Sequence, residues 1–77
     1  MFFKRLKDIR EDEDKLQKEV AITLKITRQQ YGLYENGERK IPIDKLIELA
    51  LLYRTSVDYL VGLTDEKRPY PRAKKIN

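Results

Sequence analysis

The sequence predicts an all-α fold of five short helices, and three observations support this class. Apolar residues recur at spacings of three and four along most of the chain, and no stretch alternates between apolar and polar residues as a half-buried strand does. The connections between the apolar stretches are short, which is typical of one compact bundle. A length of 77 residues also allows one domain at most.

The first two predicted helices lie in the N-terminal third of the chain. Phe2, Leu6 and Ile9 share one face of a first helix, which ends near Glu13. The apolar positions of the second helix are Leu16, Val20, Ala21 and Leu24. Because the next apolar residue, Ile26, follows almost at once, a very tight turn must connect the second helix to the third.

Turn and cap residues delimit the other three helices. Asn36-Gly37 ends the third, because glycine adopts the left-handed conformation that closes a helix. Pro42 opens the fourth, because proline fits the first turn. Thr55-Ser56 offers an N-cap for the fifth, which Gly62 ends. The apolar residues of the third helix are Ile26, Tyr31 and Tyr34, and those of the fifth are Val57, Leu60 and Val61. The fourth helix is expected to have one apolar face, made of Ile43, Leu46, Ile47, Ala50 and Tyr53.

Composition divides the chain into a domain over residues 1–66 and a basic, proline-containing tail over residues 67–77. The tail combines prolines with like charges, so we expect a flexible segment, either disordered or loosely docked. Its basic residues are Lys67, Arg68, Arg72, Lys74 and Lys75. Removing these five charges from the net charge of +4 leaves −1 on the domain. Overall basicity therefore gives no argument for nucleic-acid binding, which must rest on where individual charges lie.

Missing residue types exclude several classes of function. The chain has no cysteine and no histidine, so it lacks disulfides, the commonest zinc ligands and the commonest general base. The acidic run Glu11-Asp12-Glu13-Asp14 has no second cluster to complete a metal or acid–base site. We therefore expect no enzyme, no cofactor, no metal and no small-molecule substrate.

The apolar stretches also fall short of the roughly 18 residues that a membrane span needs, and the N-terminus lacks a signal-peptide pattern. The sequence therefore predicts a cytoplasmic protein without a membrane partner.

The stretch from Gln17 to Asn36 predicts a helix-turn-helix. Ala21 is small where the two helices must cross closely, and Thr27 occupies the N-cap position of the third helix. Long polar residues follow at the start of that helix: Arg28, Gln29 and Gln30. Arginine pairs with guanine through two hydrogen bonds and glutamine with adenine, and helix-turn-helix proteins insert this helix start into the major groove. The pattern therefore predicts contacts with the bases of double-stranded DNA.

Three stretches around the predicted turn form a combined pattern: Gln17-Lys18-Glu19-Val20-Ala21, Leu24-Lys25-Ile26-Thr27 and Tyr34-Glu35-Asn36-Gly37-Glu38-Arg39. Downstream, it continues in Ile41-Pro42-Ile43-Asp44-Lys45-Leu46, Leu49-Ala50 and Ser56-Val57-Asp58-Tyr59-Leu60-Val61-Gly62. This pattern resembles the Cro and phage-repressor-type helix-turn-helix family, which is also called lambda-repressor-like. The resemblance covers roughly residues 4–63. It implies a compact five-helix DNA-binding domain of a phage or bacterial regulator, with the helix-turn-helix in the second and third helices.

The resemblance implies roles for individual residues. Arg28 and Gln29 match positions that contact bases, with Gln30 beside them and Leu33 on the next exposed turn. The residues expected along the sugar-phosphate backbone are Gln17, Thr27, Asn36, Arg39 and Lys40. Arg10 and Glu35 match a partly buried ion pair that connects the first helix to the end of the third.

Three residues depart from the family pattern. Lys25 stands where the turn usually has glycine, and a left-handed conformation there costs on the order of 1 kcal/mol. Leu16 replaces the usual Ser or Thr N-cap of the second helix. Leu33 replaces a polar residue; it either meets a thymine methyl group or leaves the bases to Arg28, Gln29 and Gln30.

The expected function is sequence-specific regulation of transcription, most simply by a repressor that binds a palindromic operator as a homodimer. Leu49, Leu52, Tyr53 and Tyr59 give the last two helices more apolar surface than one core face needs. This surplus is either additional core or a dimer seam, and the seam residues would be Leu52, Tyr53, Val57 and Tyr59.

A second hypothesis is a protein-interaction regulator or antitoxin-like subunit on the same fold, in which DNA binding is secondary. The near-neutral domain, the acidic run and Leu33 favour it slightly. The dependence of DNA affinity on salt distinguishes the two hypotheses, because several phosphate contacts give a steep negative slope.

Overall fold

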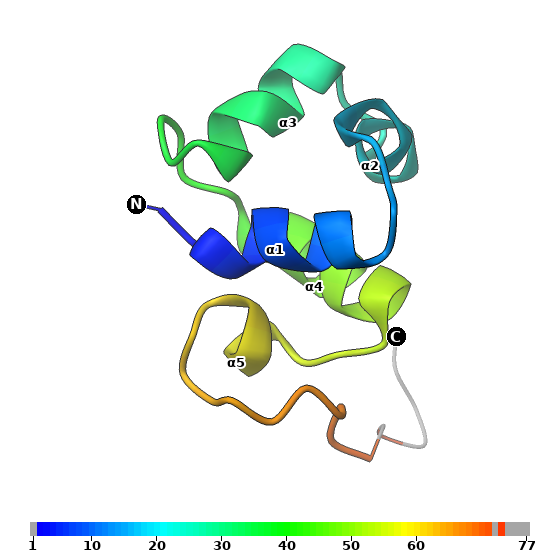
Figure 1. Cartoon of the computed structure of the whole chain (residues 1–77), viewed down its shortest axis with the longest axis vertical. Helices are drawn as coiled ribbons and strands as arrows, with labels where there is room; N and C mark the ends of the chain where they lie inside the picture. The colour runs from blue at the N-terminus through cyan, green and yellow to red at the C-terminus, as the bar shows by residue number, and fades with distance from the viewer. Residues whose placement is uncertain (1, 72, 74–77) are drawn as a thin grey trace.

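The computed structural model describes residues 2–71 and 73, and these residues form five α-helices and no strand. The helices are α1 (Lys4–Asp12), α2 (Gln17–Leu24), α3 (Arg28–Glu35), α4 (Ile43–Tyr53) and α5 (Val57–Leu60). As Figure 1 shows, α2 and α3 lie at one end of the molecule and α5 at the other, while α1 and α4 cross between them. The predicted all-helical class is confirmed.

The core takes buried side chains from all five helices. The buried apolar residues are Leu6, Ile9, Val20, Ala21, Leu24, Tyr31, Ile41, Leu46, Leu49, Ala50, Tyr53 and Leu60. Burial also raises the pKa of the Tyr31 and Tyr53 hydroxyls well above the usual value, so both stay neutral. This single cluster holds α2 and α3 on the rest of the domain.

The helix starts show how local chemistry fixes the ends of elements. Ser56 caps α5, because its Oγ accepts a hydrogen bond from the Tyr59 amide at 3.0 Å. Pro42 precedes α4 as its N-cap residue rather than lying inside the first turn. Leu16 has no side-chain acceptor, but the Glu19 carboxylate accepts from the Leu16 amide at 2.7 Å. Glutamate three residues on therefore partly replaces the missing cap of α2.

The predicted end of the last helix is confirmed: α5 ends at Leu60, Val61 is its C-cap residue, and the left-handed Gly62, with a φ of 86°, follows directly. Two expectations about buried faces are wrong. Phe2 is exposed and precedes α1, and Phe3 packs against the core instead. Ile43 and Ile47 are exposed, because α4 is apolar on more than one side and turns its other apolar side inward. That buried side consists of Leu46, Leu49, Ala50 and Tyr53.

The predicted dimer seam also needs correction. The Tyr53 side chain is only 4% exposed and belongs to the core, so it cannot line a surface between two copies. Leu52, Val57 and Tyr59 are half-buried and pack against the core. Leu49 is fully buried, so part of the apparent apolar surplus is simply core.

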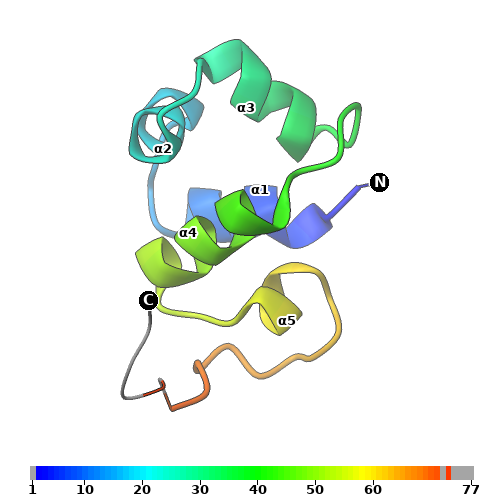
Figure 2. The same ribbon diagram turned by 180° about the vertical axis from the view of Figure 1, so that it is seen from behind.

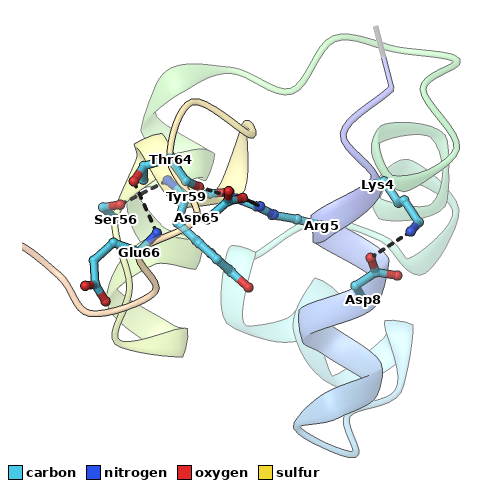
Figure 3. A network of polar contacts seen from close by, with 8 residues as sticks. All are labelled: Lys4, Arg5, Asp8, Ser56, Tyr59, Thr64, Asp65 and Glu66. Atoms are coloured by element: carbon cyan, nitrogen blue, oxygen red, sulfur yellow. Dashed lines mark hydrogen bonds and ion pairs between the residues drawn. The ribbon is translucent and has the colours of Figure 1, made fainter.

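The chain after α5 folds back along the domain as a strap, defined as residues 64–71. Arg5 of α1 holds its start (Figure 3). The guanidinium of Arg5 donates to the Tyr59 carbonyl at 2.9 Å and to the Thr64 carbonyl, and it pairs with the Asp65 carboxylate. It also lies 4.2 Å from the centroid of the Tyr59 ring, within the range of a cation–π interaction.

Three contacts hold the rest of the strap. The buried Thr55 hydroxyl donates to the Lys67 carbonyl at 2.6 Å, and Lys67 Nζ lies 3.9 Å from the Glu13 carboxylate. The Tyr70 hydroxyl donates to Asp58 at 3.0 Å. Contacts with the domain thus continue past the boundary predicted after residue 66. The tail residues Arg72, Lys74 and Lys75 lie outside the described residues.

Candidate nucleic-acid interface

The first turn of α3 is the outermost part of the helix-turn-helix. Arg28, Gln29 and Gln30 are all exposed. In both Figure 1 and Figure 2, α3 runs along one end of the molecule with α2 beside it, and no other helix covers its outer side. The structure therefore presents these polar side chains at one end of the domain.

A reciprocal pair of hydrogen bonds fixes the start of α3. Thr27 Oγ1 accepts from the Gln30 amide at 3.0 Å, and Gln30 Oε1 accepts from the Thr27 amide at 2.9 Å. This is a capping box, and Thr27 occupies the N-cap position that the sequence predicts. The capping box also occupies the side-chain carbonyl oxygen of Gln30. A two-bond contact with adenine would need that same oxygen. Arg28 and Gln29 are thus better suited than Gln30 to contact bases.

Three features fix the conformation of the turn between α2 and α3. Lys25 adopts the left-handed conformation, with φ of 59° and ψ of 41°, as its position in the turn predicts. The amide of Ile26 donates to the Ala21 carbonyl at 3.0 Å and so closes the end of α2. In addition, Lys45 Nζ of α4 donates to the Leu24 carbonyl at 2.9 Å, where a cation also favours the helix dipole. The angle between α2 and α3 is therefore fixed by backbone and side chain together.

Arg10 and Glu35 form a two-bond ion pair between α1 and the end of α3. Arg10 Nε and Nη2 each donate to a different oxygen of Glu35, both at 2.9 Å, and Nη1 donates to the Lys15 carbonyl at 2.8 Å. Glu35 is 2% exposed. Burial acts to raise the pKa of its carboxyl, but the hydrogen bonds from Arg10 and Gln17 help to hold that pKa below the usual value. Glu35 is therefore charged at neutral pH and anchors α3 to α1.

Gln17 extends this ion pair to the exposed surface. Its Nε2 donates to Glu35 Oε1 at 3.1 Å, and its Oε1 accepts from Arg28 Nη1 at 3.5 Å. The same oxygen lies 3.7 Å from where a side chain at Gly32 would begin, so Gln17 lies close over α3. Arg10, Glu35, Gln17 and Arg28 thus form one chain of contacts through three helices. Sequence reasoning missed the contact between Gln17 and Arg28, because it joins residues of different helices.

The remaining predicted residues lie further along α3 and in the loop after it. Leu33 is half-buried, and its carbonyl accepts from the Arg39 amide at 3.1 Å, which folds the loop back against α3. The Asn36, Arg39 and Lys40 side chains are exposed. The structure therefore places the cations of this loop near the C-terminal end of α3.

Charge is distributed unevenly between the two ends of the domain. Residues 17–40 carry five basic and three acidic side chains, and the buried Glu35 is one of those acids. Residues 41–66 carry two basic and five acidic side chains. Of the acidic run at residues 11–14, Glu13 pairs with Lys67 of the strap rather than with the helix-turn-helix. The segment that contains α2 and α3 thus carries a net charge of +2, although the domain as a whole carries −1.

Over residues 2–71 and 73, we find no group of three or more acidic, histidine or cysteine side chains that could hold a metal ion. Within that same part of the chain, no helix is both long and apolar enough to cross a membrane.

Comparison with known proteins agrees with this geometry. The family model described as "Helix-turn-helix" matches residues 6–60, which include α2, the turn and α3. The chain belongs to the helix-turn-helix family. The predicted resemblance to Cro and phage-repressor-type members is thereby confirmed.

Three relatives from Bacillus subtilis (strain 168) carry names of HTH-type transcriptional regulators. YobD is 39% identical over 77 residues, covering 100% of this chain and 67% of YobD. YqaE is 36% identical over 77 residues, covering 99% of this chain and 66% of YqaE. ImmR is 41% identical over 59 residues, covering 77% of this chain and 46% of ImmR. No solved structure gives a significant match. The chain thus spans about two thirds of YobD and YqaE and less than half of ImmR.

Proposed function

We propose that this helix-turn-helix protein regulates transcription by inserting the start of α3 into the major groove of specific DNA sites. The observation that carries the proposal is the exposed polar turn at Arg28 and Gln29, held by a capping box and by the chain of contacts from Arg10. Precise placement matters, because base contacts depend on side chains that are aimed before they bind. The names of the three relatives support regulation of transcription.

Arg28 and Gln29 determine the sequence in this proposal. Arg28 hydrogen-bonds guanine, and its long contact with Gln17 directs its side chain along the surface of α3. Gln29 has no competing role in the capping box and pairs with adenine. Gln30 and Leu33 have smaller roles. The side-chain oxygen of Gln30 already accepts a hydrogen bond from the Thr27 amide, and Leu33 is half-buried.

Contacts with the sugar-phosphate backbone determine position in this proposal. Arg39 and Lys40 supply charge beyond the end of α3, and Asn36 supplies an exposed amide nearby. Gln17 and Thr27 lie at the starts of α2 and α3, where helix amides and the helix dipole favour phosphate oxygens. These contacts add affinity without choosing a sequence.

The finer parts of the proposal concern assembly and outcome. Two copies bind inverted half-sites of a palindromic operator as a homodimer, since two-fold protein symmetry matches two-fold DNA symmetry. Binding at a promoter blocks transcription, so the protein acts as a repressor. It works in the cytoplasm, with no catalytic step, no cofactor and no small-molecule substrate.

The test is the dependence of duplex affinity on salt concentration. In a dimer, Arg39 and Lys40 of both copies make four phosphate contacts. These contacts give a slope of about −4 in a plot of log K for DNA binding against log salt concentration. A slope near zero, or no binding to any duplex, would contradict the proposal and favour a partner-binding regulator on the same fold. The exposed apolar side of α4 is the observation that keeps this second candidate open.

A further inference from the structure

The outer side of α4 carries an exposed apolar ridge, which consists of Ile43, Ile47 and Leu51. These side chains are 62%, 47% and 49% exposed, although α4 already supplies four buried residues to the core. Their spacing of four residues aligns them in one row along the helix. Three aliphatic side chains in a row on so small a domain indicate a contact surface.

Grooves run along both flanks of the α4 ridge. On one flank, a groove of about 310 Å³ separates Ile47 and Leu51 from Pro69, Tyr70 and Pro71 of the strap. On the other, a groove of about 510 Å³ separates Leu51 and Leu52 from Thr23 and Lys25 at the end of α2. Helices pack when the row of side chains on one fills the groove beside the row on the other. A second copy of this chain offers one such row and two such grooves.

Charge at the two ends of the ridge favours a second copy over an unrelated partner. Asp44 lies beside the start of the ridge and Arg54 just after α4; both are exposed, and neither forms an ion pair within the described part of the chain. A two-fold axis between Ile47 and Leu51 brings Ile47 of one copy to Leu51 of the other. The same axis brings Asp44 of one copy to Arg54 of the other. Each contact then occurs twice, as a self-complementary interface requires.

The position of α4 in the fold suits a dimer that binds DNA. Figure 2 shows α4 on the near side of the molecule, with α3 above it and α5 below. The two-fold axis of the dimer can run in front of α4, from the end of the molecule with α3 to the end with α5. The α3 helices of both copies then face the same way. Two copies paired in this manner present both reading helices to one side of a duplex.

We infer that the α4 ridge, flanked by the strap, is the surface through which two copies of this chain pair. This inference rests on the homodimer of the proposed function and replaces the predicted seam around Tyr53. Pairing covers Ile43, Ile47 and Leu51, and the Pro69-Tyr70-Pro71 segment forms the edge of the interface on each copy.

The experiment measures self-association of the full chain by sedimentation equilibrium, without DNA and again with duplex DNA. Ile47→Asp buries a charge in the apolar contact and should weaken the dimer at least about tenfold, while circular dichroism stays unchanged because Ile47 is half-exposed. Leu63→Asp is the matched control: Leu63 follows α5, is highly exposed and lines neither groove beside the ridge, so this change should leave the dimer unchanged.

A charge exchange adds a readout that folding cannot imitate. Asp44→Arg and Arg54→Asp should each weaken the dimer, and the two together should restore it. The inference is overturned if the wild-type chain stays monomeric with and without DNA, if Ile47→Asp dimerises as well as wild type, or if the double exchange restores nothing. Because pairing is also measured without DNA, a ridge dimer that binds no duplex would contradict only the proposed DNA-binding function.

Discussion

The exposed faces of α3 and α4 differ in chemistry, although both helices also supply buried residues to the same core. α3 turns Arg28 and Gln29 toward solvent, whereas α4 turns Ile47 and Leu51 toward solvent. A polar, positively charged face fits a duplex, and an apolar face fits another protein surface. In this small domain the fold alone therefore does not determine which helix binds DNA and which binds protein. The exposed side chains of each helix determine it, provided that the rest of the domain holds the helix in place.

The largest expected effect on stability comes from removing the ion pair that anchors α3 to α1. Glu35→Gln leaves the largely buried Arg10 guanidinium without its anion, which should lower the free energy of unfolding by about 3 kcal/mol. Urea denaturation measures this change. Glu38→Gln removes a charge from an exposed side chain just beyond α3 and should change stability by less than about 0.5 kcal/mol. Equal losses in the two variants would show that the buried pair does not anchor α3.

The same ion pair predicts a dependence of stability on acid. The pKa of Glu35 is lowered in the folded protein, from 4.5 for the free side chain. Its contribution is therefore complete above about pH 4.5 and is lost as the pH falls through the folded-state pKa. The difference in unfolding free energy between wild type and Glu35→Gln should thus shrink below that pH. A constant difference across this range would assign the stabilisation to something other than the charge.

A smaller effect is expected for the outer face of α3 in DNA binding. Arg28→Ala should cost about 1–3 kcal/mol in binding a preferred site and relax the choice at one base pair. Lys40→Ala should instead weaken preferred and random duplexes alike and reduce the salt slope by about 1 for each copy bound. Fluorescence anisotropy with both duplexes measures the two variants side by side. If Arg28→Ala lowered both affinities equally, Arg28 would contact phosphate rather than a base.

The smallest expected effect concerns the turn that joins α2 to α3. Lys25→Gly relieves a non-glycine residue at a φ of 59° and should raise the free energy of unfolding by up to about 1 kcal/mol. Lys7→Gly, within α1 at an exposed position, should lower it by about the same amount. Thermal denaturation of the two variants gives both signs, and a loss of stability in Lys25→Gly would mean that its side chain contributes more than its strain costs.

The sequence was a good guide where structure depends on neighbouring residues. The caps at Thr27 and Ser56 and the left-handed turn at Lys25 were all predictable, because capping and turn chemistry act within a few residues. Periodicity failed on α4, since a helix that is apolar on several sides does not specify which side is buried. It assigned Ile43 and Ile47 to the core and so concealed the exposed ridge.

The resemblance implied one contact between distant residues, the Arg10–Glu35 ion pair, but two others were not predicted from the sequence. The hydrogen bond between Gln17 and Arg28 depends on how α2 crosses α3. The contacts of Arg5 with the Thr64 carbonyl and the Asp65 carboxylate depend on where the chain turns after α5. Both follow from packing of the whole core, which no local pattern encodes.

The central claim is that the start of α3 chooses a DNA sequence, and selection from a random duplex library tests it most directly. The wild-type chain should enrich one motif, with inverted half-sites about 10 base pairs apart from centre to centre. Arg28→Ala and Gln29→Ala should each lose preference at one position in every half-site. If wild type enriched no motif, or if both variants enriched the same motif as wild type, the account would be contradicted.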